Sequence, residues 1–482
     1  MSTAMTSPAA GSAADQLVRI LGPDGFLRSA TDVAPFLTDH RKLYRGRALG
    51  VAVPRSVEQI CALLAFCNQE RIGVVPQGGN TGYCGGATPD ESGQQVVLAL
   101  ARLKRIRSVD PLNYSLLAEA GCTLHEVQTA AAQAARLFPL SLGSEGSCQI
   151  GGNLSTNAGG TSVLRYGMMR DLVLGLEVVL ADGRILPCTQ GLRKDNTGYD
   201  VKSLFLGAEG TLGVITAAQL KLFPQIRSTA TAFVALPDIA SAVRLLAELR
   251  DASGDRVSSF ELIPRIAVEL AMRHIPNVAD PLAGPYPWYA LCELTSSQQD
   301  EPLGALLERA LEDALARALI LDATISQSER ERAQLWRLRE NVPEAQRLDG
   351  ASLKHDLSLP ITVLPQFVER AGQWLAANVP DGRLVAYGHV GDGNLHFNLN
   401  QAPGADREAF LAREASIKRA LHDLVQEFGG SFSAEHGIGQ LKVGELERYA
   451  PAVELDLMHA IKYALDPRGI LNPGKVLKRP TP

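Results

Sequence analysis

Two histidines near the C-terminal end of the chain are spaced so that they could share a metal ion. His389 and His396 begin and end the segment 389–396, and Asp392-Gly393 lies between them. An Asp-Gly pair predicts a two-residue hairpin turn, and this turn would place the two histidines directly opposite each other on one face. Their Cβ atoms would then lie about 4.5–5.5 Å apart, which suits a shared ion.

A carboxylate and a third histidine follow in the segment 434–439, which reads Ala-Glu-His-Gly-Ile-Gly. Glu435 would complete the ligand set, because two imidazoles and one carboxylate with open positions suit zinc, iron or manganese. A neutral imidazole such as that of His436 takes up a proton near pH 7. Asn398 falls on the same face of the predicted strand as His396. The alternative is a hairpin with two polar histidines and an unrelated Glu-His pair.

Loops dense in glycine lie in the first half of the chain and predict a phosphate-bearing ligand. They span residues 77–82 and 143–160, and residues 207–213 add a third short run. Such loops permit close backbone approach and aim N–H groups at anions. Together they favour a diphosphate-bearing cofactor, whereas one such loop alone could be a structural cluster of turns. Neither GxGxxG after a strand nor GxxxxGK[ST] occurs, which argues against a Rossmann NAD site and a P-loop.

Length and composition limit the classes of protein that the chain could be. With 482 residues, two or three domains are expected. The net charge of -5 gives no sign of a nucleic-acid surface, and no apolar run approaches the roughly 18 residues that cross a bilayer. Seven cysteines occur without a CxxC pair, which favours structural thiols in a reducing cytosol. Residues 1–15 do not resemble a signal peptide, and we expect a disordered tail there.

The periodicity of apolar residues indicates which elements must position these groups. A helical segment is expected over 16–45, and alternating strands and helices over 46–224 surround the glycine-rich loops. After Pro224 glycine becomes rare, and we expect a second domain over 225–465 followed by a C-terminal segment, 466–482, that returns to the cofactor. Helices of this second domain are predicted at 239–252, 303–319, 328–341, 362–378, 407–428 and 453–465.

The glycine-rich half resembles the FAD-binding domain of the vanillyl-alcohol-oxidase-type flavoproteins. The resemblance lies in residues 76–82, 150–159 and 165–167. It implies an α+β fold in which two subdomains clasp FAD, and an α+β substrate domain with an antiparallel sheet. The first loop has no histidine to which the flavin could be attached, so we expect non-covalent FAD. The residues expected to contact FAD are Pro76, Gly78, Gly79, Asn80, Thr81, Gly82, Ser144, Gly152, Asn153, Thr156, Gly159, Val214 and Asn472.

The two histidine motifs resemble those of the D-2-hydroxyglutarate and D-lactate dehydrogenases, a branch of the same superfamily. The resemblance implies that His389, His396 and Glu435 bind the metal, with zinc expected first. It also implies that His436 is the base and that the substrate is held by Arg339, Lys354 and Asn398. Two cations would suit a second carboxylate, which favours 2-hydroxyglutarate over lactate. Pro343 departs from the pattern, because the hydroxyglutarate enzymes tend to place a threonine shortly after the arginine.

The chain is therefore expected to oxidise a D-2-hydroxy acid to the 2-oxo acid with FAD. D-2-hydroxyglutarate is the first expectation, and D-lactate or another D-2-hydroxy acid is the alternative. A metallohydrolase built on the His/His/Glu site, or a flavin-binding interaction module without turnover, would be different classes of protein. We expect a cytoplasmic homodimer that passes electrons to a separate carrier, either an electron-transfer flavoprotein or a quinone.

Overall fold

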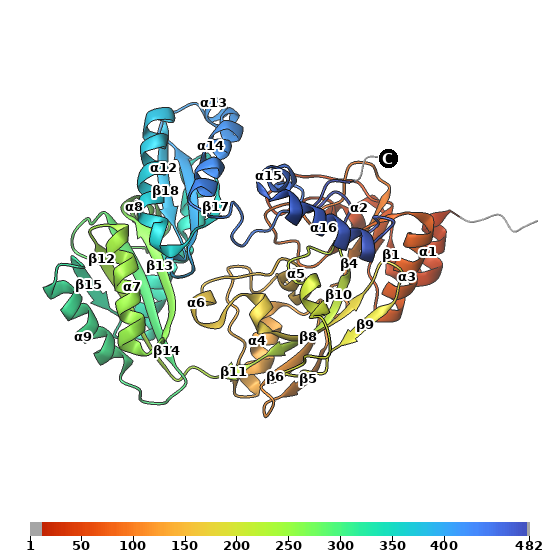
Figure 1. Ribbon diagram of the computed structural model, residues 1–482, viewed down its shortest axis with the longest axis horizontal. Coiled ribbons are helices and arrows are strands. Elements are labelled where there is room, and N and C mark those ends of the chain that lie inside the picture. The colour runs from red at the N-terminus through yellow and green to blue at the C-terminus, as the bar shows by residue number, and fades with distance from the viewer. Residues whose placement is uncertain (1–11, 480–482) are drawn as a thin grey trace, which may run out of the picture.

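The computed structural model describes residues 12–479 (Figure 1). Most of the expected N-terminal tail, residues 1–11, lies outside the described residues. The rest of that expectation is wrong, because helix α1 (Ala13–Leu21) already begins at Ala13. The Ser12 hydroxyl accepts a hydrogen bond from the Asp15 N–H and so caps this helix.

The first half contains two sheets, and the expected cofactor loops lie between them. One sheet has the order β1-β2-β4-β3, in which β2, β4 and β3 are parallel, and α1 and α3 (Val57–Glu70) pack against it. Val74 and Val96 on neighbouring strands are fully buried, as expected for a covered parallel sheet. These strands are β1 (Phe26–Leu27), β2 (Gly50–Ala52), β3 (Gly73–Gln77) and β4 (Gln95–Ala99).

The second sheet of this half is antiparallel and has the order β5-β6-β10-β8-β9. Helix α4 (Leu124–Gln133) packs against it and begins with the Thr123–Glu126 capping box. Short helix α5 (Ile150–Ser155) begins where the second glycine-rich loop turns back toward β10. The strands are β5 (Ile106–Asp110), β6 (Ser115–Glu119), β8 (Val173–Val179), β9 (Ile185–Cys188) and β10 (Val214–Lys221).

The second half begins with an antiparallel sheet of order β13-β14-β12-β15 that is covered on both faces. Alternate residues of β12 enter two different cores: Val234 packs with α7 and α9, whereas Phe233 packs with α8, α10 and α11. The strands are β12 (Ser228–Leu236), β13 (Val257–Pro264), β14 (Trp288–Ser296) and β15 (Asp322–Ile325). The helices are α7 (Ile239–Ser253), α8 (Arg265–His274), α9 (Leu303–Ala316), α10 (Glu329–Glu340) and α11 (Val342–Asp349).

A last antiparallel sheet carries the histidine motifs. Its central strand β19 pairs with β18 on one side and with β16 and β17 on the other. Gly388, just after β18, forms two backbone hydrogen bonds with Leu262 of β13, so the two sheets of this half meet at their edges. The elements are β16 (Ser352–Leu353), β17 (Asp356–Ser358), α12 (Leu364–Asn378), β18 (Gly382–Tyr387), β19 (Asn394–Gln401), α13 (Arg407–Ala412) and α14 (Glu414–Glu427).

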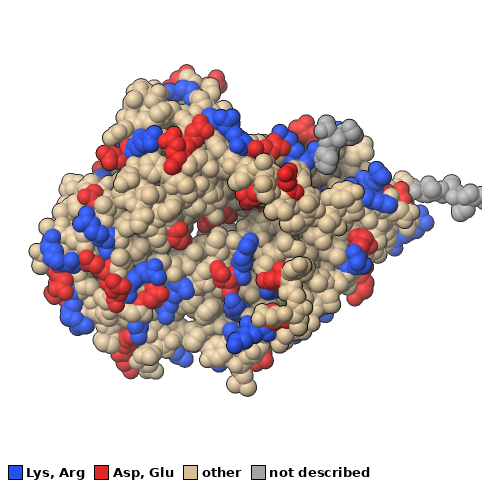
Figure 2. Space-filling view, in the orientation of Figure 1, with Lys and Arg blue, Asp and Glu red and all other residues tan. Residues whose placement is uncertain are grey.

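After these sheets the chain crosses back to the first half through α15 (Val443–Tyr449) and α16 (Ala452–Leu465), shown in dark blue (Figure 1). Leu471 then pairs in parallel with Val74 of β3. The molecular surface is hollowed where the two halves face each other (Figure 2). None of the helices within residues 12–479 is both long and apolar enough to cross a membrane. The α+β fold class predicted from the sequence is confirmed.

Candidate active site

A cleft between the two sheets of the first half is lined by the predicted cofactor loops. The lining comes from the first loop, the second loop and the start of β10, and the cleft opens to solvent. Within the described chain, none of the backbone N–H groups of residues 78–82 donates to a protein acceptor. The Gln149 Oε1 atom in the lining is buried and also lacks a protein partner. Unpaired donors along a narrow glycine-rich cleft suit the pyrophosphate of FAD.

One glycine shows why this loop excludes side chains. A Cβ atom on Gly79 would lie 2.0 Å from the Ser147 carbonyl oxygen, so the two glycine-rich loops touch backbone to backbone. Asn80 next to it has a φ of 53° and donates its side-chain amide to the Thr38 carbonyl at 2.9 Å. The two loops therefore form a rigid wall of backbone groups.

Most of the predicted FAD contacts line this cleft, and three do not. The residues in the lining are Pro76, Gly78, Gly79, Asn80, Thr81, Gly82, Gly152, Asn153, Thr156 and Val214, whereas Ser144, Gly159 and Asn472 lie outside it. The Asn472 amide donates to the carbonyls of Gly86 and Glu209. Asn472 thus supports the first loop from behind.

His436 is the one lining residue that comes from the second half of the chain; the others lie between residues 76 and 215. Its Nδ1 atom is 3.3 Å from Oδ2 of Asp356, and that oxygen also accepts the backbone N–H groups of Glu435 and His436 at 2.9 Å. Tyr83, just past the first loop, packs on the imidazole with ring centroids 4.8 Å apart. Asp356 therefore fixes the orientation of His436 beside the cleft.

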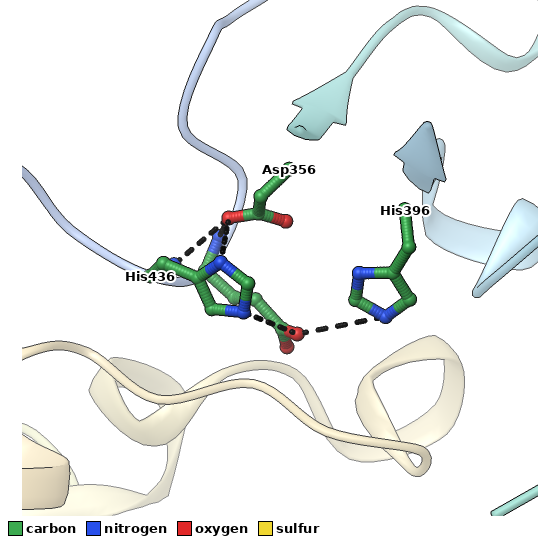
Figure 3. Close-up of side chains that lie close together, drawn as sticks. Asp356, His396 and His436 are labelled. Atoms are coloured by element: carbon green, nitrogen blue, oxygen red, sulfur yellow. Dashed lines mark hydrogen bonds and ion pairs between the residues drawn. The ribbon is translucent and has the colours of Figure 1, made fainter. Parts of the chain in front are cut away.

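His436 and three other side chains bring their donor atoms together, and three of the four are labelled in Figure 3. Donor atoms of Asp356, His396, Glu435 and His436 all lie within 4.8 Å of one another. Glu435 Oε1 is 3.8 Å from Nε2 of His396 and 3.7 Å from Nε2 of His436. These separations exceed hydrogen bonds, and they are near the roughly 3.4 Å between two ligands of one tetrahedral zinc ion. The donor set fits a divalent metal.

His389 lies beside this group, but the predicted hairpin register is wrong. Strand β18 ends at Tyr387, and Tyr387 rather than His389 is paired with His396. Residues 388–393 form a longer connection, because Gly388 bonds to Leu262 and Val390–Asp392 is a 3₁₀ turn closed by Gly393 at a φ of 84°. The two imidazoles nevertheless approach, with ring centroids 5.5 Å apart. Two imidazoles on one ion have centroids roughly 5 Å apart.

A buried carboxylate, Glu261 of β13, lies behind His389. Its Oε1 is 2.5 Å from Nδ1 of His389, and its Oε2 accepts Nε of Arg339 at 2.7 Å. Burial opposes ionisation of Glu261, but the charges of Arg339 and His389 outweigh it and lower the pKa of Glu261 to about 2. Burial likewise acts against a charged His389, and the Glu261 carboxylate prevails and raises the pKa of His389 to about 9. A metal ion at Nε2 of His389 would replace one of its protons.

Burial and charge also set the states of His396 and Asp356. Burial, followed by the nearby His389 charge, holds the pKa of His396 well below its usual value, so its imidazole is neutral and free to bind a metal. Burial works against an ionised Asp356, but the charges of His436 and Lys442 hold its pKa below the usual range. Asp356 is therefore an anion beside the imidazole of His436.

The predicted substrate cations lie at different depths. Arg339 is only 6% exposed, in the last turn of α10, and its guanidinium lies over the Tyr387 ring at 4.9 Å. Only its Nε is used within residues 12–479, since neither Nη group donates to a protein acceptor there. Lys354 is exposed between β16 and β17. Partial loss of water around its ammonium group, followed by the charge of Arg41, lowers the pKa of Lys354.

Asn398 is buried and bonded within the protein. Its amide donates to Gln346 Oε1 at 3.0 Å, and its Oδ1 accepts the His355 N–H at 3.2 Å. Both bonds brace β19 against its neighbours, and they leave one N–H and one oxygen lone pair of the amide for a ligand.

Three residues of the site were not foreseen: Glu209, Glu261 and Asp356. Glu209 lies in the third glycine-rich run, and its partly buried carboxylate accepts the backbone N–H groups of Ile438 and Gly439 at 2.7 and 2.8 Å. It thereby ties the loop that carries His436 to the first half. Only Asp356 had a sequence signal, because it is two residues after Lys354 and is followed by an alternating strand.

Two family models match different parts of the chain. Residues 48–189 match the family model described as FAD binding domain, and residues 225–476 match that of FAD linked oxidases, C-terminal domain. The p-cresol methylhydroxylase structure with substrate bound has the same fold, with a TM-score of 0.76 over 97% of this chain and 96% of that one at 18% identity.

Two sequence relatives extend over nearly the whole chain. D-2-hydroxyglutarate dehydrogenase, mitochondrial, of Bos taurus is 39% identical over 94% of this chain and 81% of its own length. D-2-hydroxyglutarate dehydrogenase of Xanthomonas citri pv. viticola is 35% identical over 93% of each chain. The expected cytoplasmic location is contradicted, since the Bos taurus relative and the one from Arabidopsis thaliana are named mitochondrial. The chain belongs to the family of FAD-linked oxidases that includes the D-2-hydroxyglutarate dehydrogenases.

Proposed function

We propose that the protein oxidises D-2-hydroxyglutarate to 2-oxoglutarate with FAD. The observation that carries the proposal is the place of His436, which lines the FAD cleft and lies within the cluster of metal-donor atoms. A base in that position reaches a substrate held between an ion and a flavin. The names of the Bos taurus and Xanthomonas citri relatives support hydroxyglutarate as the acid.

We assign the metal to His389, His396 and Glu435, with zinc as the first expectation. The Glu261 bond to Nδ1 of His389 supports this set, because a metal-bound imidazole usually donates its other N–H to a carboxylate. Such an ion would polarise the hydroxyl and carboxylate oxygens of the acid.

His436 has the role of base in this proposal. Its Nδ1 faces Asp356, so the Nε2 lone pair is directed toward the Glu435 side of the cluster and takes the hydroxyl proton. The Asp356 anion stabilises the imidazolium that results, and Tyr83 limits rotation of the ring. When FAD is bound along the glycine-rich cleft, without a covalent link, it would supply the acceptor for the hydride of the α-carbon.

The far carboxylate of the acid is assigned to Arg339 and Lys354. The free Nη groups of Arg339 form a fork that suits a carboxylate. Lys354, with Arg41 near it, adds positive charge on the solvent side. Asn398 can contact the substrate through its second amide N–H while it keeps both of its bonds to the protein.

The test is anaerobic mixing of the purified holoenzyme with D-2-hydroxyglutarate while the flavin absorbance is followed. We expect rapid bleaching with this acid, slower bleaching with D-lactate and D-malate, and none with L-2-hydroxyglutarate. Removal of the metal with a chelator should abolish bleaching, and zinc should restore it. If no D-2-hydroxy acid bleaches the metal-replete flavin, the proposal is wrong.

The role of His436 is tested by His436→Ala. General base catalysis contributes about 10²–10⁴-fold, so the rate of flavin reduction should fall by that factor. FAD and metal content should remain those of the unchanged protein, since neither is held by this side chain in the proposal. A near-normal rate would remove His436 as the base.

The electron acceptor and the assembly remain predictions. We expect reduced flavin to pass electrons to an electron-transfer flavoprotein or a quinone, and we expect a homodimer. Reoxidation kinetics with each carrier and light scattering of the purified protein test the two expectations.

A further inference from the structure

Glu261 lies where three parts of the site meet. It is on β13 next to Leu262, the residue whose backbone bonds hold Gly388, and His389 follows Gly388 in the chain. Helix α10 ends above it, so that Arg339 in the last turn reaches the same carboxylate. The Glu261 side chain is 1% exposed, and water therefore does not compete for either of its oxygens.

The two partners of Glu261 have different tasks in the proposed function. His389 is assigned to the ion, which holds the hydroxy-acid end of the substrate, and Arg339 is assigned to the far carboxylate. Glu261 uses one oxygen for each of them, at 2.5 Å and 2.7 Å. The separation of the two substrate-binding groups is therefore set through one rigid, planar carboxylate.

We infer that Glu261 is a positioning residue that couples the metal ligand His389 to the substrate anchor Arg339 and so selects hydroxy acids with a second carboxylate at the matching distance. The inference rests on the proposed function, because it uses the roles given there to His389 and Arg339. It goes beyond that function by predicting that metal affinity and choice of substrate respond to the same side chain.

Hydrogen-bond chemistry explains why a carboxylate is required. An ionised carboxylate accepts from both Nδ1 of His389 and Nε of Arg339, which leaves the Nε2 lone pair of His389 free for the ion. A glutamine cannot serve both partners. If its oxygen faces Arg339, its amide donates to Nδ1 and forces the proton onto Nε2, where the ion would bind. If it is flipped, its amide faces the Arg339 donors.

The molecule provides a matched control in Glu293, on the neighbouring strand β14. This buried glutamate binds the same helix, α10, through Arg332 at 2.7 Å and Trp336 at 2.9 Å. Within the described residues its side chain has no hydrogen bond or ion pair with the proposed metal ligands or with Arg339. A role of Glu261 that merely holds α10 in place would be shared by Glu293.

The experiment measures Zn²⁺ affinity of the FAD-loaded, chelator-stripped protein by competition with a fluorescent zinc indicator. We expect Glu261→Gln to weaken zinc binding by about 10–100-fold, as for other residues that orient metal-bound histidines. Glu293→Gln should remain within about twofold of the unchanged protein. Equal losses in the two variants, or no loss in Glu261→Gln, would overturn the inference.

A second variant keeps the test decisive if Glu261→Gln does not fold. Arg339→Gln leaves every proposed metal ligand in place, but it releases the second oxygen of Glu261. Zinc affinity should change by about fivefold or more in this variant, because coupled sites influence each other reciprocally. An unchanged zinc affinity would show that the two groups are independent and that the inference is wrong.

Substrate choice supplies the last readout. Glu261→Gln should reduce kcat/KM for D-2-hydroxyglutarate more than for D-lactate, which has no second carboxylate. Equal reductions would contradict the role in specificity. Failure of the proposed function would look different, since no D-2-hydroxy acid would then reduce the flavin of the unchanged protein, whereas the zinc measurements would still give an answer.

Discussion

The cofactor cleft and the histidine cluster differ in the atoms that form them. The FAD cleft is formed by backbone groups of glycine-rich loops, with free N–H groups along residues 78–82. The proposed catalytic cluster is formed by side chains, whose positions are set by buried carboxylates such as Asp356 and Glu261. Where the two loops touch, the backbone wall tolerates no added atom. A cluster of side chains tolerates a change of shape but not the loss of a charge.

The backbone wall should fail completely when one methyl group is added. In Gly79→Ala the new Cβ would lie 2.0 Å from the Ser147 carbonyl oxygen, so one of the two loops must move. We expect colourless protein, measured as flavin absorbance relative to protein absorbance. Gly146→Ala is the control, because nothing lies within 4 Å of its Cβ. Full FAD content in Gly79→Ala would show that the wall is adaptable.

The cluster should keep its shape but lose its chemistry in Asp356→Asn. The amide has nearly the volume of the carboxylate but carries no charge to stabilise protonated His436. We expect flavin reduction to slow by about 10²–10⁴-fold with FAD content unchanged, measured by stopped-flow absorbance. Asp349→Asn, which changes a buried carboxylate bonded to His274 away from the site, should leave the rate nearly unchanged. Similar losses in both variants would indicate a general loss of structure.

Glu209 connects the glycine-rich cleft to the loop that carries His436. Its substitution should slow flavin reduction less than Asp356→Asn does. Glu209→Gln removes the charge that holds two backbone N–H groups of the loop after His436. A charge-assisted hydrogen bond contributes about 1.5–3 kcal/mol, so we expect about a tenfold slower flavin reduction and faster hydrogen exchange in residues 436–440. Glu91→Gln, at an exposed position of the same half, is the control. Unchanged hydrogen exchange in residues 436–440 would show that Glu209 does not hold this loop in place.

The smallest expected effect is a loss of folding stability in acid. It should arise in the second half of the chain, from two buried histidines. Burial lowers the pKa of His355 to about 3 and, opposed by Glu445, that of His422 to about 4. Such neutral histidines support the fold above the unfolded pKa of 6.5, and this support is lost as the pH falls toward the folded values. Between pH 7 and pH 5, each of these two histidines should lower the free energy of unfolding by about 2 kcal/mol.

The measurement is the fall in Tm between pH 7 and pH 5. In His355→Leu the fall should be about 4–8 °C smaller than in the unchanged protein, since about 2 kcal/mol of it is removed. His125→Leu, at an exposed position, should show the full fall. The same fall in all three proteins would place the acid sensitivity elsewhere.

The contrast between a cleft of backbone groups and a cluster of side chains also explains what could be predicted from the sequence. The density of glycine predicted the cleft directly, because only residues without a Cβ atom let two backbone segments approach this closely. Helix α7 was predicted to within one residue, since its apolar period and its Gly254 end are local signals. Helix α11 was missed: it follows α10 without a loop because Pro343 is tolerated in a first helical turn.

The histidine cluster was predicted for a partly wrong reason. The Asp-Gly pair suggested that His389 faces His396 across a turn, whereas the rings meet because Gly388 is held to β13. The contacts of Glu261 and Asp356 join strands and loops that are about 80–130 residues apart in the chain. Such pairings depend on how sheets meet at their edges, which no local pattern encodes.

The pairing of Leu471 with Val74 has a consequence for the order in which the protein is made. Strand β3 is the edge of its sheet, and residues 470–472 cover that edge with two backbone hydrogen bonds to Val74. A ribosome adds about 5–20 residues per second. Residues 470–472 are therefore synthesised roughly 20–80 seconds after strand β3. During that interval the nascent chain presents an open, apolar strand edge, the feature on which chains aggregate and to which chaperones bind.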